Sequence, residues 1–195
     1  MNIAASRAIN AVIFAVTLVL IARCFRKDGR WSSEGGRIAF RFFTVQSYAL
    51  CAVASLLTCL APSRSWAWIV KYIGTAAVSV TMMTVLLFLG PSMGGYGPLL
   101  KGGDLFMHLL TPLMAILSFS LFERREMGFA TALWGMLPVV LYGVWYLYKI
   151  VYAPEDRRWD DFYGFNRGGR WPVAFAGMMI GGFATCMALM ALQNL

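Results

Sequence analysis

The chain has 195 residues, of which 59% are hydrophobic and 13% charged, whereas soluble domains average about 45–50% apolar and about 25% charged residues. Seventeen lysines and arginines against nine aspartates and glutamates give a net charge of +8. This composition excludes a water-soluble fold. The basic residues form short clusters between apolar runs, which indicates membrane orientation and not nucleic-acid binding. We therefore expect membrane lipids, and no nucleic acid, as partners.

Six apolar stretches are long enough to cross a bilayer, which takes about 20 residues. They cover residues 3–25, 38–60, 66–89, 105–122, 129–153 and 171–192. The tails and connectors leave no room for a soluble domain. We therefore expect an all-α integral membrane protein, a six-transmembrane-helix bundle that forms a single transmembrane domain over residues 1–195. The first stretch is interpreted as a span and not as a signal peptide, because Arg23 precedes Cys24 where cleavage requires small residues.

The basic residues of the connectors predict the orientation, because cytoplasmic loops carry an excess of lysine and arginine. The odd connectors contain Arg26, Lys27, Arg30, Arg37, Lys101, Arg157, Arg158, Arg167 and Arg170. The opposite face has Arg7, Arg64, Arg124 and Arg125. We expect the odd connectors in the cytoplasm and both termini outside.

Several classes of membrane protein do not fit the polar residues. Every acidic residue falls in a connector or within a turn of one, so the mid-membrane carboxylates of an ion-coupled transporter are missing. One histidine does not make a bis-histidine haem site. The four cysteines form no C-x-x-C pair and are interpreted as packing residues. The sequence predicts no metal and no cofactor.

His108 lies about one turn into the fourth stretch, and an ionisable side chain inside a span is a functional hypothesis. The alternative is an interfacial histidine bonded to a headgroup or to a carbonyl. Thr44 lies about six residues into the second stretch, which enters the membrane from the same side. At 1.5 Å per residue the two side chains are roughly 9 and 5 Å deep, so they can meet in one shallow layer.

Small and polar residues recur at three- and four-residue steps around both positions. These stripes contain Thr44, Ser47, Cys51, Ser55 and Thr58 in the second stretch and His108, Thr111, Ala115 and Ser118 in the fourth. Such stripes are more typical of helix packing in lipid than of a site. They nevertheless turn Thr44 and His108 toward the interior of the bundle.

A threonine becomes a nucleophile when a neighbouring base takes its proton, and neutral histidine suits this role near pH 7. Asp104 lies four residues before His108 and either orients the imidazole or is the N-cap of the helix. Candidate oxyanion donors are Ser47, Gln46, Tyr163 and the amides of the glycine-rich connector 94–103, and the sequence does not choose among them.

Two segments carry a family resemblance. The segment at 42–48 reads F-F-T-V-Q-S-Y, and the segment at 105–112 reads L-F-M-H-L-L-T-P. They resemble the signature segments of the androgen-induced, FAR-type six-helix transmembrane threonine hydrolases and their bacterial relatives, which commonly read F-T-x-Q-S-N and H followed shortly by P. Tyr48 stands where that pattern has Asn. The aromatic connector at 160–165 before Trp171 is also similar, without the usual prolines.

The resemblance implies a hydrolase of lipid esters in a bacterial inner membrane, with Thr44 as nucleophile and His108 as base. Animal members hydrolyse fatty acid esters of hydroxy fatty acids, so the implied substrate is a lipid or fatty-acyl ester. Two alternatives remain. One is an acyltransferase that uses the same pair, and the other is a non-enzymatic membrane binding or assembly protein in which the pair only hydrogen-bonds between helices.

Overall fold

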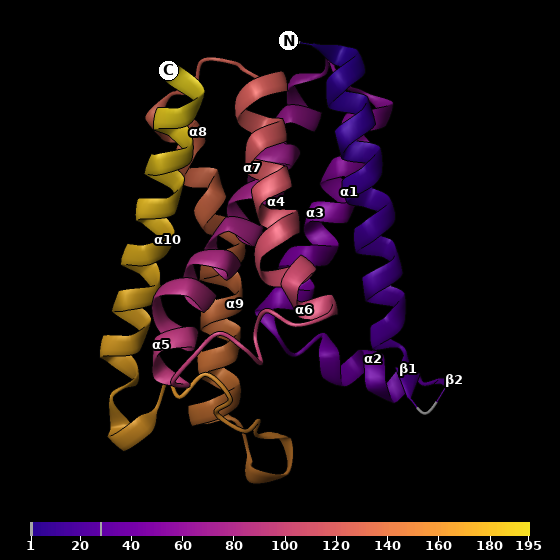
Figure 1. Cartoon of the computed structure of the whole chain (residues 1–195). Helices are drawn as coiled ribbons and strands as arrows, with labels where there is room; N and C mark the ends of the chain where they lie inside the picture. Colours follow the sequence, from indigo (N-terminus) through magenta and orange to yellow (C-terminus); the bar gives the residue numbers. More distant parts are fainter. Residues whose placement is uncertain (1, 28) are drawn as a thin grey trace.

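Six helices of this protein are long and apolar enough to cross a membrane, in a computed structural model that describes residues 2–27 and 29–195. They are Ile3–Cys24, Phe43–Leu60, Ser65–Ser92, Gly103–Phe122, Phe129–Tyr152 and Trp171–Asn194. They lie side by side as one bundle, with both termini at the same end (Figure 1). The prediction of an all-α six-helix membrane protein is therefore confirmed.

Several spans consist of shorter helical segments joined end to end. In chain order the helices are α1 (Ile3–Cys24), α2 (Ser33–Ala39), α3 (Phe43–Leu60), α4 (Ser65–Thr84), α5 (Gly90–Ser92), α6 (Gly103–Leu105), α7 (Thr111–Phe122), α8 (Phe129–Leu133), α9 (Leu137–Leu147) and α10 (Trp171–Asn194). Three π-helical turns, η1 (Val85–Leu89), η2 (Phe106–Leu110) and η4 (Tyr148–Tyr152), and the 3₁₀ turn η3 (Trp134–Met136) connect them. A two-residue hairpin, β1 (Arg26–Lys27) with β2 (Arg30–Trp31), follows α1.

Prolines explain these irregular turns. A proline has no N–H to donate to the carbonyl four residues earlier, so the helix before it changes its hydrogen-bond pattern. Pro112 leaves the His108 carbonyl without this donor, and the Thr111 amide bonds to the Phe106 carbonyl across a wider π-helical turn. Pro91, Pro138 and Pro154 likewise follow η1, η3 and η4.

The second stretch differs from the predicted span 38–60. The structure divides it into α2 and α3, with a break at residues 40–42. Side chains bind the carbonyl groups that the break leaves free, since Tyr142 donates to the Arg41 carbonyl and Gln46 to the Phe40 carbonyl, both at 2.8 Å. The break places Thr44 in the first turn of α3 and not about six residues into a helix.

The core of the bundle is built around α4, which packs against α3, α7, α9 and α10. Every residue from 74 to 82 in α4 is buried. At the end of the bundle away from the termini, an aromatic cluster joins the fifth connector to α9, and the connector contains the 3₁₀ turns η5 (Glu155–Arg157) and η6 (Arg167–Gly169). This end also holds the first turn of α3 and η2, where Thr44 and His108 lie.

Candidate active site

His108 lies in η2, and a backbone carbonyl fixes its imidazole. Its Nδ1 is 2.7 Å from the carbonyl oxygen of Leu99 in the glycine-rich connector. Because a carbonyl only accepts, this contact requires the proton on Nδ1, and it leaves the lone pair of Nε2 as the basic position. A half-buried imidazole in this tautomer is suited to remove a proton from a hydroxyl group.

Asp104 neither orients the imidazole of His108 nor caps the helix, the two roles predicted for it. Its side chain is exposed and makes no hydrogen bond to His108, and Leu99 has the orienting role at the imidazole. The N-cap of α6 is Gly102, whose φ of +58° suits a residue without a side chain. Asp104 lies instead in the first helical turn, where a carboxylate interacts favourably with the helix dipole.

Thr44 is the second residue of α3, at a helix N-terminus whose free amides are partly satisfied by a tyrosine. No side chain caps this helix, and the Phe43 amide donates to the hydroxyl oxygen of Tyr163 at 3.1 Å. Thr44 is the next residue, so the Tyr163 oxygen lies at the helix end that holds Thr44. The N-terminal end of a helix carries partial positive charge, so negative charge that develops near Thr44 is stabilised there.

A hydrogen bond one turn deeper sets the relative position of Thr44 and His108. The Tyr48 hydroxyl lies 2.8 Å from that of Thr111, and this bond links α3 to the start of α7. Thr44 precedes Tyr48 by four residues and His108 precedes Thr111 by three, so they lie about 6 Å and about 4.5 Å below the bond along their helices. They occupy one level of the bundle, but no hydrogen bond joins them.

The other predicted oxyanion donors near Thr44 have partners of their own. The Ser47 hydroxyl donates to the Thr44 carbonyl at 3.0 Å and lies 2.9 Å from the Thr81 hydroxyl. Gln46 donates to the Phe40 carbonyl at the break before α3. Among the predicted side-chain donors, Tyr163 is therefore the one that contacts the start of α3, through the Phe43 amide, without a further acceptor of its own.

The fifth connector holds Tyr163 through a chain of hydrogen bonds that the sequence did not reveal. Asp161 accepts from the Tyr146 hydroxyl at 2.9 Å and from the amides of Phe165 and Asn166 at 2.8 and 2.7 Å. The Tyr146 hydroxyl in turn accepts from the Tyr163 amide at 3.2 Å. The repeated aromatic residues of this connector were the only sequence signal for such packing.

Burial raises the pKa of the Tyr163 hydroxyl above its usual value, and the hydrogen bond from the Phe43 amide offsets only part of the rise. The phenol is therefore protonated at neutral pH. The Phe43 amide occupies one acceptor position of this oxygen, and the O–H group has no hydrogen-bond acceptor among the described residues.

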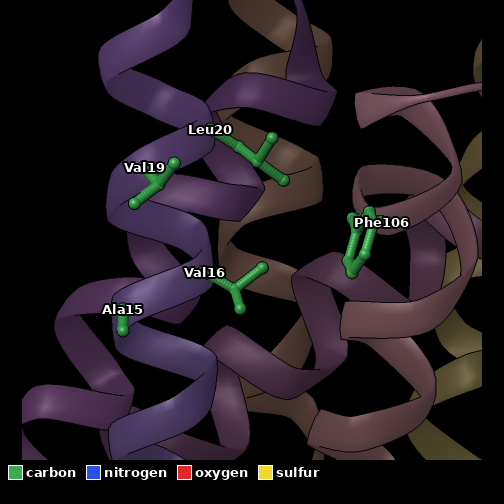
Figure 2. A pocket seen from close by; sticks show the side chains of 5 residues that line it. All are labelled: Ala15, Val16, Val19, Leu20 and Phe106. Atoms are coloured by element: carbon green, nitrogen blue, oxygen red, sulfur yellow. The ribbon is translucent and has the colours of Figure 1, made fainter.

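Two apolar grooves flank this level of the bundle. One, of about 310 Å³, lies between α3 and α9 and is lined by Phe43, Gln46, Ser47, Leu50, Pro138, Leu141, Tyr142 and Trp145. The other, of about 320 Å³, lies between α1 and η2. Figure 2 shows Val16 and Leu20 of α1 pointing across it toward Phe106, which is two residues from His108. Hydrocarbon chains fit such surfaces.

The part of the chain that the structure describes contains no candidate metal site, since no three His, Cys, Asp or Glu side chains come together there.

The fold and the site define a six-helix membrane protein with a hydroxyl and an imidazole at one level. In comparisons with known proteins, no family model, no curated protein and no solved structure matches the chain.

Proposed function

We propose that this protein is an intramembrane lipid-ester hydrolase in which Thr44 is the nucleophile and His108 the general base. The observation that carries the proposal is the bond between His108 Nδ1 and the Leu99 carbonyl, which leaves Nε2 free as a base at the level of Thr44. Tyr163 beside Thr44 supports it with a donor for the oxyanion.

The reaction has two halves. His108 Nε2 removes the proton of the Thr44 hydroxyl, whose oxygen attacks the ester carbonyl. Tyr163 donates a hydrogen bond to the resulting oxyanion, and the alcohol leaves with the proton from His108. Water, deprotonated by the same histidine, then attacks the acyl-threonine and releases the fatty acid and free Thr44. Substrate must bring the two side chains into contact, as often happens with catalytic hydrogen bonds that are long in the free enzyme.

The substrate class follows from the surroundings of the pair. The groove beside Phe106 is lined by apolar side chains, and the groove along α3 by apolar side chains with Gln46 and Ser47, while Thr44 lies at a helix end. A fatty-acyl ester, such as a fatty acid ester of a hydroxy fatty acid, fits this arrangement. With the odd connectors in the cytoplasm, the site faces the cytoplasmic leaflet of a bacterial inner membrane.

The test is ester hydrolysis by purified protein in detergent. Thr44→Ala and His108→Ala are each expected to lower kcat by about a thousandfold or more without changing the melting temperature. Thr131→Ala is the matched control, because Thr131 is a half-buried threonine of a spanning helix and lies in α8, at the end of the bundle where the termini lie (Figure 1). Full activity in either site variant excludes the mechanism. Inactive wild-type protein, with every lipid ester tried, favours the non-enzymatic alternative.

A further inference from the structure

A second polar cluster lies at the opposite end of the bundle, on the side of the two termini. It contains charged and hydroxyl-bearing side chains from four spans, each 2% exposed or less: Ser6, Asn10, Ser55, Lys71, Thr75, Ser118 and Glu123. Ionisable side chains inside a membrane bundle are rare, because removing a charge from water is costly unless partners compensate. The burial of this cluster therefore requires an explanation, and the proposed active site around Thr44 does not provide it.

Glu123 directly follows α7 and is held by donors from two helices. Its Oε1 accepts from Ser6 at 2.9 Å, from Ser118 at 2.7 Å and from the amide of Asn10. The indole of Trp68 in α4 donates to the Glu123 carbonyl at 2.7 Å. Three donors on one oxygen satisfy half of the carboxylate, while Oε2 has no partner.

Lys71 faces the same space but does not touch the carboxylate. It follows Trp68 by three residues, so both lie on one face of α4. Its Nζ has no hydrogen-bond partner, and no ion-pair contact joins it to Glu123.

Three further buried atoms around these charges have no partner: the side-chain oxygens of Asn10, Ser55 and Thr75. A buried polar group without a hydrogen bond costs about 1–3 kcal/mol. Helices α3 and α4 have little freedom to close the gap, because a Cβ at Gly74 would already lie 2.9 Å from the Cβ of Ala54. A ligand with both donors and acceptors satisfies these atoms together.

The charge of the cluster selects that ligand. The formal charges of Lys71 and Glu123 cancel, so an added ion would leave a net charge in a medium of low dielectric constant. A neutral molecule with two donors and two acceptors adds no net charge. Lys71 lies six residues into α4, about 9 Å from the helix start, so water at the bundle end is near. Buried waters commonly make three hydrogen bonds to such groups.

We propose that the space between Lys71 and Glu123 is a binding site for a small cluster of ordered water molecules, which bridge the ammonium to Oε2 and bind Asn10, Ser55 and Thr75. The pair is thus a hydrated ion pair that connects α1, α3, α4 and α7 at the end of the bundle away from Thr44. It is independent of the proposed hydrolase activity.

Radiolytic hydroxyl-radical footprinting of the purified protein tests for this water, because radicals formed from a bound water oxidise the nearest reactive side chain. Cys51 borders the cluster next to Ser55, whereas Cys186 packs among apolar residues, and both are 0% exposed. Cys51 is expected to be oxidised several-fold faster than Cys186, with ¹⁸O incorporated from labelled water. Equal, slow oxidation of the two thiols contradicts the proposal.

A double-mutant cycle in the full chain tests the pair itself. Lys71→Met and Glu123→Gln are each expected to lower the melting temperature, because each leaves one buried charge uncompensated. The melting temperature of the double variant should fall by much less than the sum of the two single decreases. Cys51 should be oxidised more slowly in the double variant than in wild type. Exposed Glu126→Gln is the matched control and should have no effect. Additive losses contradict the proposal, since the charges then do not interact.

Discussion

Tyr163 is the residue through which the fifth connector reaches the first turn of α3. Its oxygen accepts from the Phe43 amide, and in the proposed mechanism its O–H donates to a carbonyl bound at Thr44. Tyr163→Phe removes this donor and keeps the ring in its aromatic cluster. We expect kcat for ester hydrolysis to fall by about a hundredfold, with KM little changed, because an oxyanion donor acts mainly in the transition state.

Tyr148→Phe is the control for this substitution. Tyr148 is 44% exposed on η4, and its hydroxyl has no protein partner among the described residues. Its loss should leave kcat unchanged. If kcat is equally unchanged in Tyr163→Phe, the oxyanion role belongs to another donor.

At the residue scale, the sequence predicts Thr44 and His108 as a catalytic pair but does not predict their hydrogen-bond partners. The lone histidine and the hydroxyl at similar depth can be identified from residue types in the sequence. The Leu99 carbonyl that binds His108 is a backbone group that any residue supplies. Lys71 and Glu123 lie near span ends in the sequence and are buried in the structure. Their burial depends on how α1 and α3 pack over them, which the sequence of one helix does not encode.

The element that positions Tyr163 is the connector from residue 155 to residue 170, and Asp161 organises it. Asp161→Ala removes the acceptor of three hydrogen bonds, including that from Tyr146. We expect limited proteolysis at the arginines of the connector to become several-fold faster and kcat to fall with it, because Tyr163 loses its fixed position.

The adjacent residue provides the control for Asp161→Ala. Asp160 is exposed, and its side chain makes no hydrogen bond in the described residues, so Asp160→Ala should change neither the proteolysis rate nor kcat. Unaltered proteolysis and kcat in Asp161→Ala would show that the connector holds Tyr163 without this carboxylate.

At the element scale, hydropathy predicted where the spans lie because length and apolar content suffice for that. It did not predict the break between α2 and α3, since residues 38–60 read as one apolar run. The break depends on tertiary contacts, in which Tyr142 binds the Arg41 carbonyl. The sequence predicts the glycine-rich connector only as a source of candidate oxyanion amides, and its Leu99 carbonyl makes a contact to His108 that was not predicted.

For the whole molecule, the even number of spans places both termini at one end of the bundle (Figure 1), and the basic connectors predict that this end is outside. A C-terminal alkaline phosphatase fusion in a bacterial inner membrane should therefore be active, and a green fluorescent protein fusion dark. The reverse pattern would place the Thr44 level at the outer leaflet and contradict the predicted orientation.

The most direct measurement of the central claim is to locate a covalent adduct on the protein. Purified wild-type protein is treated with a fluorophosphonate probe, digested and analysed by mass spectrometry. We predict one modified residue, Thr44, with labelling lost in His108→Ala because the base that activates the hydroxyl is gone. Absence of labelling under conditions in which the protein hydrolyses a lipid ester, or an adduct on Ser47 instead of Thr44, would contradict the account.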